Sequence, residues 1–431
     1  PLDTARSSCP SYNHTPGRNI WKKYMKLKGF GVVALIAFGC AVAQSFGRFT
    51  YGILLPAVRN DLGISNTIAG SLLTINVAAY LFGAIVVAAA TGRLKLLAVM
   101  RIGFVFSTSG LVLAAASPGA LVLGVAMFLC GLGGACIWIP SPVIASDALA
   151  PERRGLAIGL IFSGGGLGIV FAGQLSGFMR SVSGDSGWRT VYLIQAAIAL
   201  AVALLTFFFI THNQRSAPSK GGFGGFSALT RMRGWLPITM AYSFFGFMYI
   251  LVLGFLSTRL EDDSNWTSGR ASLAFTVVGV AMIFGGPFIM KLVGKFGPRN
   301  CLATAFATWG LCCLLVLPGW FSPTLVLCVG FGLIFGGIPS IVTLYFVQNA
   351  SLADYGPSYA AGTLAFGVAQ MISPQMGGVI ADLTGSFALV LVLSAVFAFG
   401  GSIAALSLPK QPKVPLAKPL MAPLVFDVSR R

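Results

Sequence analysis

The feature that most constrains this chain is a series of long apolar runs separated by short polar segments. A helix of about 18–25 apolar residues is long enough to cross the ~30 Å hydrocarbon core of a bilayer. Twelve runs of sufficient length can be delimited along the 431 residues. They cover residues 30–58, 68–91, 96–116, 120–147, 156–180, 188–211, 235–259, 270–293, 301–318, 322–348, 360–382 and 385–408. The chain is therefore expected to cross a membrane many times.

The composition agrees with a chain that is buried in lipid. Hydrophobic residues make up 56% of it and charged residues 9%, with a mean hydropathy of +0.85, whereas a soluble globular chain carries roughly a quarter charged residues. Lipid offers the backbone no hydrogen-bond partners, so spanning segments are helices or closed barrels, and the alternation of a barrel strand is absent. The sequence predicts an all-α integral membrane protein with twelve transmembrane helices. It excludes a disordered chain, a collagen and a disulfide scaffold.

The net charge of +18 would suit a nucleic-acid partner, so the position of the charges decides what they mean. With twelve spans, all but six of the 29 Lys and Arg residues lie in tails and loops on the side of both termini. The exceptions are Arg59, Arg180, Arg189, Arg259 and Arg270 on the other side, and Arg48 inside a run. Because cytoplasmic loops are enriched in basic residues, we expect a multi-pass protein of the cell inner membrane with both termini cytoplasmic. Its expected partner is the lipid bilayer and not nucleic acid.

The polar, Gly/Ser-rich and basic segment 212–234 divides the runs six and six. Such a segment is typical of a linker between two halves. Two interpretations of residues 1–24, which contain no Met, stay open: a segment outside the native protein, or a disordered tail. The predicted organisation is a cytoplasmic basic tail at 1–29, an N-terminal six-helix half at 30–211, a cytoplasmic linker at 212–234, a C-terminal six-helix half at 235–408, and a cytoplasmic basic tail at 409–431.

The two halves carry a weak internal repeat. Four short motifs recur in the same order at offsets between 199 and 205 residues. They are Phe82-Gly83-Ala84 with Phe284-Gly285-Gly286, Gly92-Arg93 with Gly294-Lys295, Ile139-Pro140-Ser141 with Ile338-Pro339-Ser340, and Gly173 with Gly378. A parallel repeat of six helices predicts two pseudo-symmetric halves, related by an axis along the membrane normal.

Three stretches of the sequence resemble the major facilitator superfamily, and in particular its YbfB/YjiJ-type branch. They are Ser-Phe-Gly-Arg-Phe-Thr-Tyr-Gly-Ile-Leu-Leu-Pro at 45–56, Pro-Glu-Arg-Arg-Gly at 151–155, and Leu-Ile-Phe-Ser-Gly-Gly-Gly-Leu-Gly-Ile at 160–169. The resemblance extends from about Met25 to Leu408 and implies a twelve-helix transporter fold. It supplies no substrate, because that branch has none that is settled.

One loop departs from the superfamily pattern. The usual Gly-x-x-x-Asp-Arg-x-Gly-Arg-Arg between the second and third spans is reduced here to Gly83 and Gly92-Arg93, without the Asp. That Asp normally pairs across the cytoplasmic gate. We therefore expect a different latch, with Arg93 and Asp147 or Asp354 as candidates.

Arg48 is the clearest candidate for a binding residue, since an ionisable side chain inside a membrane is costly and by default marks a functional site. Its planar guanidinium suits a carboxylate or a phosphate, because it can bond two oxygens at once. Two interpretations stay open. Arg48 contacts a substrate or a gate, or else it extends toward the interface or braces neighbouring carbonyl groups.

Other polar side chains inside the runs are candidates for the same site. In an α-helix Gln44, Arg48 and Tyr51 would share one face, at positions i, i+4 and i+7. Asn76 and Tyr80 in the second run are the other favoured substrate contacts. Trp138 either lines the site or faces lipid.

Glycines and prolines mark candidate sites of gating and helix packing. Gly164, Gly168 and Gly173 lie in a run with small residues four apart, which lets helix backbones approach closely. The alternative interpretation of these glycines is a signature of exporters. Pro140 and Pro339 are repeat partners, and each removes a helix hydrogen bond and permits a bend.

The sequence also restricts the chemistry. No Asp or Glu lies near the middle of a run, and the two His residues, His14 and His212, lie outside the runs. Coupling through a central carboxylate is therefore disfavoured, and the candidate coupling ion is a proton or a counter-anion. No catalytic, metal-binding or complete nucleotide-binding motif is present, so we expect no enzyme activity and no cofactor.

Together these observations predict a monomeric secondary active transporter. It would move a small organic solute, held as an anion by Arg48, across the cytoplasmic membrane by alternating access. The alternative is an exporter of amphiphilic drugs or metabolites with broad specificity.

Overall fold

The computed structural model describes residues 27, 29–90, 93–150, 153–210, 224–351 and 354–409. The two basic tails lie almost wholly outside these ranges, as does the first part of the predicted linker. The regular elements in the described ranges are all helices. The prediction of an all-helical protein is therefore confirmed.

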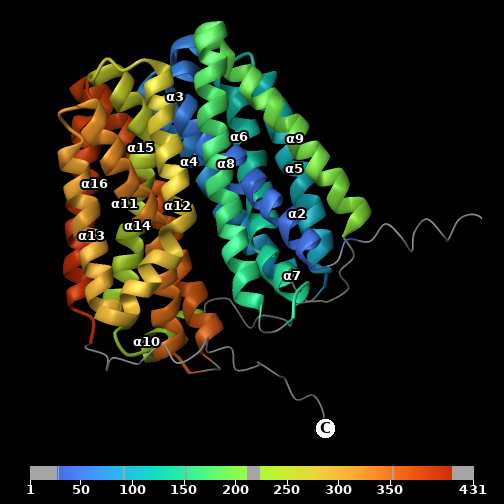
Figure 1. The fold of residues 1–431 in the computed structure, drawn as a ribbon, viewed down its shortest axis with the longest axis vertical. Coiled ribbons are helices and arrows are strands. Elements are labelled where there is room, and N and C mark those ends of the chain that lie inside the picture. Colours follow the sequence, from blue (N-terminus) through green and yellow to red (C-terminus); the bar gives the residue numbers. More distant parts are fainter. Residues whose placement is uncertain are drawn as a thin grey trace, which may run out of the picture.

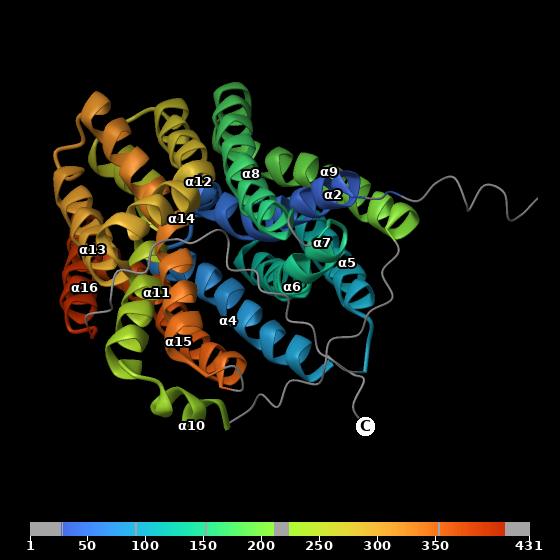
Figure 2. The ribbon, with the colours of Figure 1, turned by 60° about the horizontal axis from the view of Figure 1, so that its bottom comes forward.

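The helices gather into two groups that follow the order of the chain (Figure 1, Figure 2). The N-terminal group holds α2 (Phe30–Cys40), η1 (Ala41–Phe49), α3 (Thr50–Leu62), α4 (Asn66–Ala90), α5 (Leu96–Ala115), α6 (Ala120–Trp138), α7 (Ser141–Asp147), α8 (Arg154–Ser183), η3 (Gly184–Ser186) and α9 (Gly187–Phe209). The C-terminal group holds α10 (Gly224–Arg231), α11 (Trp235–Thr258), η4 (Arg259–Asp263), α12 (Ser268–Phe296), α13 (Pro298–Leu315), α14 (Phe321–Asn349), α15 (Tyr355–Thr384) and α16 (Ala388–Leu406).

Ten helical stretches among the described residues are long and apolar enough to cross a membrane. The longest, Leu156–Phe209, contains both α8 and α9 and so covers two of the expected runs. The expected run at 301–318 corresponds to α13, an 18-residue helix that is not among the ten stretches. The apolar runs of the sequence thus become the long helices of the structure.

Both ends of the described chain lie at the same end of the bundle (Figure 1). Helix α2 begins there and α16 ends there, and the short helices α7 and α10 lie at this end as well. We call it the tail end. The opposite end, where α3, α8 and α11 finish, is called the distal end.

Contacts between the two groups run along three helix pairs, which are α3 with α11, α4 with α15, and α8 with α12. Glycines let these backbones touch near the distal end. A Cβ atom on Gly70 would lie 2.5 Å from the carbonyl oxygen of Pro374, and one on Gly166 would lie 2.8 Å from that of Gly279. Larger side chains at these positions would push the groups apart.

Helix α10 lies within the range that the sequence assigns to the linker. It packs against α15 of the C-terminal group. Arg231 in α10 donates a 2.6 Å hydrogen bond to Asp354, which immediately precedes α15. The second part of the linker is therefore docked on the C-terminal group.

Candidate functional site

The first membrane helix is interrupted by a wide turn that contains Arg48. Residues Ala41–Phe49 form the π-helix η1 between α2 and α3. In a π-helix each hydrogen bond spans five residues instead of four; such turns are rare and occur frequently at functional sites. The extra residue in each turn changes the direction of the side chains that follow.

Neighbouring helices hold this wide turn in place. Asn76 of α4 donates hydrogen bonds to the Gly47 and Met127 carbonyl oxygens, at 2.8 and 2.9 Å. Thr50 donates to the Ser45 carbonyl oxygen at 2.9 Å and accepts from Gln195 of α9 at 2.9 Å. These contacts occupy carbonyl groups that a regular helix would satisfy by itself. They fix the backbone on either side of Arg48.

Arg48 is buried, and no carboxylate among the described residues forms an ion pair with it. Only 6% of the Arg48 surface is exposed. Its buried Nε and Nη2 atoms have no hydrogen-bond partner among the described residues. Its guanidinium carbon lies 5.3 Å from the centre of the Tyr80 ring and 5.9 Å from that of Phe49. Cation–π contacts of this kind recover only part of the cost of burying a charge. Donor capacity for an anion is therefore left unused.

Aromatic rings of the C-terminal group lie directly opposite Arg48. Phe49 meets Phe335 of α14 edge to face, with ring centres 5.6 Å apart. Phe335 lies 5.0 Å from Tyr249 of α11, which is in turn parallel to Phe366 of α15 at 6.2 Å. We call the set Tyr242, Phe245, Tyr249, Phe335 and Phe366 the aromatic cluster. It brings three helices of the C-terminal group to the side of the charge.

Polar groups surround the place where Arg48 and the aromatic cluster meet. The Tyr80 side chain lies beside Arg48 and in the neighbourhood of Gln44, Tyr249 and Tyr359. Tyr359 also shares a 3.2 Å hydrogen bond with Thr343, and Gln370 donates to the Tyr249 hydroxyl. Gln44, Tyr80, Thr343 and Tyr359 are only half-buried. A buried positive charge, half-buried polar groups and aromatic rings therefore lie next to one another here.

The structure brings together some of the predicted substrate contacts and separates others. Arg48, Gln44 and Tyr80 lie together. Asn76 is used in bracing η1, and the fully buried Tyr51 donates its hydroxyl to the Ala69 carbonyl oxygen at 3.0 Å. Trp138 packs edge to face on Phe162 of α8, 5.3 Å between ring centres. The α-helical spacing of Gln44, Arg48 and Tyr51 does not apply, because η1 has a wider turn.

The predicted gating residues also have different environments. The helix is interrupted at Pro140, because α6 ends at Trp138 and α7 begins at Ser141. The repeat partner, Pro339, lies inside the continuous helix α14. Arg93 is exposed between α4 and α5, and Asp147 is the exposed last residue of α7.

Asp354, the other candidate latch, lies in the C-terminal group together with its partner Arg231. Hydrogen bonds from Arg231 and Ser351 hold the pKa of the Asp354 carboxyl below its ordinary value. This ion pair fastens α10 to α15 and does not join the two groups.

The glycines of α8 face in two directions. A Cβ on Gly164 would lie 2.2 Å from the Ala37 carbonyl oxygen in α2, and Gly168 faces η1. Gly173 faces α12 instead, with the Thr276 hydroxyl 2.7 Å from where its Cβ would be. Tight packing, both within the N-terminal group and between the groups, therefore explains these glycines.

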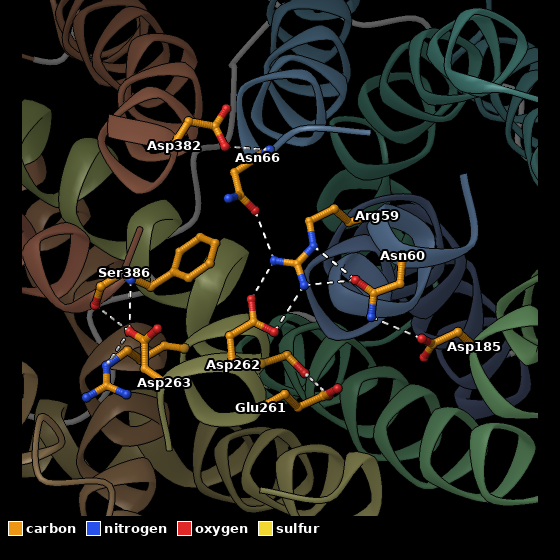
Figure 3. Close-up of polar contacts among 12 residues, drawn as sticks. Arg59, Asn60, Asn66, Asp185, Glu261, Asp262, Asp263, Asp382 and Ser386 are labelled. Atoms are coloured by element: carbon orange, nitrogen blue, oxygen red, sulfur yellow. Dashed lines mark hydrogen bonds and ion pairs between the residues drawn. The ribbon is translucent and has the colours of Figure 1, made fainter. Parts of the chain in front are cut away.

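A network of charges at the distal end, whose part around Arg59 is drawn in Figure 3, was not foreseen from the sequence. Arg180 of α8 donates to both carboxylate oxygens of Glu261 in the other group, at 2.7 and 2.8 Å, and to Asp185 at 2.9 Å. Arg59 forms an ion pair with Asp262. We call Arg59, Asn60, Asn66, Arg180, Asp185, Glu261, Asp262 and Asp382 the distal network. The only early signal was that several arginines lie on the less basic side of the membrane.

Further polar contacts cross between the groups within the distal network and next to it. Asp382 accepts hydrogen bonds from the Asn66 and Thr67 backbone N–H groups, at 3.0 and 2.7 Å, which caps the start of α4. Ser71 donates to Gln375 at 2.7 Å. All these cross-group bonds lie in the distal parts of their helices, so they close that end of the bundle.

The described residues contain no group of three or more His, Cys, Asp or Glu side chains that could hold a metal ion. Seven cysteines in the described ranges are free and buried. Their positions inside helix packing fit small apolar residues better than redox centres.

Comparison with known proteins agrees with this fold. The chain is similar to the 4-hydroxybenzoate transporter PcaK of Acinetobacter baylyi, with 19% identity over 86% of this chain and 90% of PcaK. It is also similar to the purine ribonucleoside efflux pump NepI of Escherichia coli, with 27% identity over 68% of this chain and 78% of NepI. A bacterial homologue of the human lysosomal transporter Spinster, crystallised in an inward-facing and occupied conformation, superposes with a TM-score of 0.68 at 15% identity, covering 87% of this chain and 95% of that one.

The family assignment rests on most of the chain. A family model described as the uncharacterised MFS-type transporter YbfB matches residues 40–406. This range includes η1, the aromatic cluster and the distal network. The protein therefore belongs to the YbfB family of major facilitator superfamily transporters.

Proposed function

We propose that this transporter is a secondary active carrier of a small organic anion, and that Arg48 binds the anionic group. The observation that carries the proposal is the pair of buried, unpartnered guanidinium nitrogens of Arg48, next to the half-buried Gln44 and Tyr80. A carboxylate at this position would accept two hydrogen bonds and supply the missing counter-charge. An intramembrane charge retained without a partner is difficult to explain by stability alone.

The transport cycle that we propose is alternating access between two six-helix halves of a twelve-span protein. The N-terminal and C-terminal groups correspond to these halves, and they meet at Arg48 and the aromatic cluster. The Lys/Arg distribution supports a protein of the cell inner membrane whose tail end faces the cytoplasm. Closure by the distal network then supports an orientation in which the site opens toward the cytoplasm.

The named substrates of the relatives support a small organic solute but differ from one another. One is 4-hydroxybenzoate, which is an anion at neutral pH, and the other class is purine ribonucleosides. Arg48 favours the anion for this chain. The proposal includes a monomeric transporter and a proton or counter-anion as coupling ion.

A binding experiment on the purified full-length protein tests the anion site. A panel of small carboxylates and phosphates is screened by thermal unfolding, since a bound ligand at a hundredfold excess over Kd adds about 2.7 kcal/mol of stability. We expect at least one anion to stabilise the wild type and Arg48→Lys, and to have little effect on Arg48→Gln. Equal stabilisation of all three proteins would contradict a role for Arg48.

An exporter of amphiphiles is the second candidate, because the aromatic cluster offers a broad apolar surface. Phe335 and Phe366 are only half-buried, so a hydrophobic solute could contact them directly. In this case amphiphiles without an anionic group would stabilise wild type and Arg48→Gln to the same extent, while simple anions would stabilise neither.

A further inference from the structure

We infer that the anion carries a flat aromatic ring, so that the substrate class is an aromatic carboxylate whose ring lies on the aromatic cluster. The inference rests on the proposed anion site at Arg48 and adds the chemistry of the rest of the solute. It assigns the charge to the N-terminal group and the ring to the C-terminal group.

The first step of the argument is the distance between the two subsites. Phe49 follows Arg48 directly in η1, and its ring lies 5.6 Å from that of Phe335. The Arg48 guanidinium carbon lies 5.9 Å from the centre of the Phe49 ring, and Phe335 in turn lies 5.0 Å from Tyr249. A solute whose carboxylate is bound at Arg48 therefore has its next atoms beside the aromatic cluster.

The second step is the arrangement of the rings. Phe366 is stacked on Tyr242, with ring centres 4.4 Å apart and planes 17° apart, and lies nearly parallel to Tyr249 at 10°. Phe245 is buried behind them, 6.0 Å from Phe366 and tilted by 20°. Flat solutes match such a set of nearly parallel planes, because offset stacking is favourable beyond the burial of area.

The third step concerns which rings a solute can reach. Tyr242, Phe245 and Tyr249 are buried, whereas Phe335 and Phe366 keep part of their surface exposed. The buried rings hold the two accessible rings in fixed positions. Half-buried Tyr359 and Thr343 lie on helices α15 and α14, which also carry Phe366 and Phe335, so polar ring substituents would have hydroxyl partners nearby.

The fourth step excludes a cation on the same rings. Aromatic faces attract cations in general. Here the Arg48 guanidinium already lies over the Tyr80 ring and next to Phe49, and no described carboxylate is paired with it to cancel its charge. A second positive charge would be repelled, so an anion with an aromatic body fits the charge and the shape together.

A matched pair of ligands tests the inference. Benzoate and cyclohexanecarboxylate carry the same charge and the same number of ring carbons, but only benzoate is flat and aromatic. Binding of each to the purified full-length protein is measured by calorimetry. We expect wild type to bind benzoate roughly three- to tenfold more tightly, which is the range expected for aromatic stacking.

Variants of the protein show which residues cause the preference for benzoate over cyclohexanecarboxylate. Phe366→Leu should bring the ratio of the two affinities close to one, whereas Arg48→Gln should weaken both ligands by a similar factor. Phe284→Leu is the matched control, since Phe284 is 61% exposed on α12, and it should keep the wild-type ratio. Thermal unfolding of each variant without ligand shows that it is folded.

The outcomes separate the inference from the proposed function. Equal binding of the two carboxylates by wild type would overturn the aromatic substrate class and leave the anion site in place. An unchanged ratio in Phe366→Leu would show that the ring does not lie on the aromatic cluster. If wild type bound neither ligand nor any other carboxylate, the anion function would fail, and the inference with it.

Discussion

Two buried arginines in this protein have opposite surroundings. Arg180 at the distal end donates to both oxygens of Glu261 and to Asp185. Arg48 in the middle of the first membrane helix has two buried nitrogens that find no hydrogen-bond partner in the part of the chain that the structure describes. Both side chains are more than nine-tenths buried, so the difference is one of neighbours and not of depth.

The comparison separates a closing contact from a binding contact. Both Nη groups of Arg180 are bonded to carboxylates, and only its Nε lacks a partner among the described residues; a buried arginine paired in this way holds two structural elements together and has little capacity left for a ligand. A buried arginine with unused donors costs stability, and the cost is recovered only when an anion binds. We therefore assign the distal network to the closure of the bundle and propose that Arg48 binds the solute.

The largest expected effect comes from removing the charge of Arg48. Arg48→Met should lower anion affinity roughly 10- to 100-fold, because hydrogen bonds to charged groups contribute about 1.5–3 kcal/mol. The same change should raise the thermal stability of the empty protein, since it removes an unpaired buried charge. Calorimetry and thermal unfolding measure the two effects.

The control for this prediction is Arg180→Met. It removes a paired arginine and should destabilise the empty protein, because Glu261 would be left buried without its counter-ion. Loss of stability in Arg48→Met with unchanged anion affinity would instead mean that Arg48 braces the helix.

The next largest effect concerns the distal closure. Glu261→Gln leaves Arg180 with Asp185 alone, and we expect the closed arrangement to lose about 2 kcal/mol, less than the 3–5 typical of a fully broken buried pair. A cysteine placed at Ser71, which is bonded to Gln375 across the groups, should then react faster with an alkylating reagent.

The more exposed pair of the same network provides the comparison. Asp262→Asn weakens the ion pair with Arg59, whose side chains are 17% and 30% exposed, and surface pairs contribute only about 0–1 kcal/mol. Its effect on the Ser71→Cys reaction should be smaller. An equal or larger effect would show that Arg59, and not Arg180, controls the closure.

An effect of similar size to that of Glu261→Gln is expected from the glycines of α8. Gly166→Ala places a methyl group 2.8 Å from the Gly279 carbonyl oxygen and should separate α8 from α12, at a cost of about 1–3 kcal/mol. Gly164→Ala meets Ala37 within the N-terminal group, so it should lower thermal stability without speeding the Ser71→Cys reaction. Similar alkylation rates of Ser71→Cys in the two variants would contradict the assignment of Gly166 to packing between the groups and of Gly164 to packing within the N-terminal group.

Much of the fold could be predicted, because a bilayer leaves few options for an apolar run. Length alone identifies the spans, and the resemblance at residues 45–56 points to the family, which is confirmed over residues 40–406. Arg48 stands out because a lone charge inside an apolar run has no ordinary explanation. These signals are local in the sequence.

The rest of the candidate site could not be predicted, because it depends on distant contacts. The face assumed for Gln44, Arg48 and Tyr51 requires a regular α-helix, and nothing local in the sequence indicates the wide turn of η1. Glu261 lies 81 residues from Arg180. The aromatic cluster carries no signal of its own in a chain with 34 Phe residues.

The smallest expected effect concerns the exposed pair between Arg231 and Asp354, which fastens α10. The pKa of the folded Asp354 carboxyl is lowered, mainly by its hydrogen bond from Arg231, so the pair stabilises the docked helix fully above the ordinary carboxyl pKa. This stabilisation is lost as the pH falls through the lowered value. Arg231→Gln should therefore reduce the protection of residues 224–231 from hydrogen exchange at neutral pH, and the difference from wild type should vanish under strongly acidic conditions.

A matched variant isolates the charge. Ser227→Ala removes the other hydrogen-bond partner of Arg231, at 3.0 Å, and leaves Asp354 and its counter-ion in place. Its exchange should resemble wild type at neutral pH. A difference in Arg231→Gln that persisted in acid would mean that α10 is held by the packing of the arginine stem on α15 and not by the ion pair.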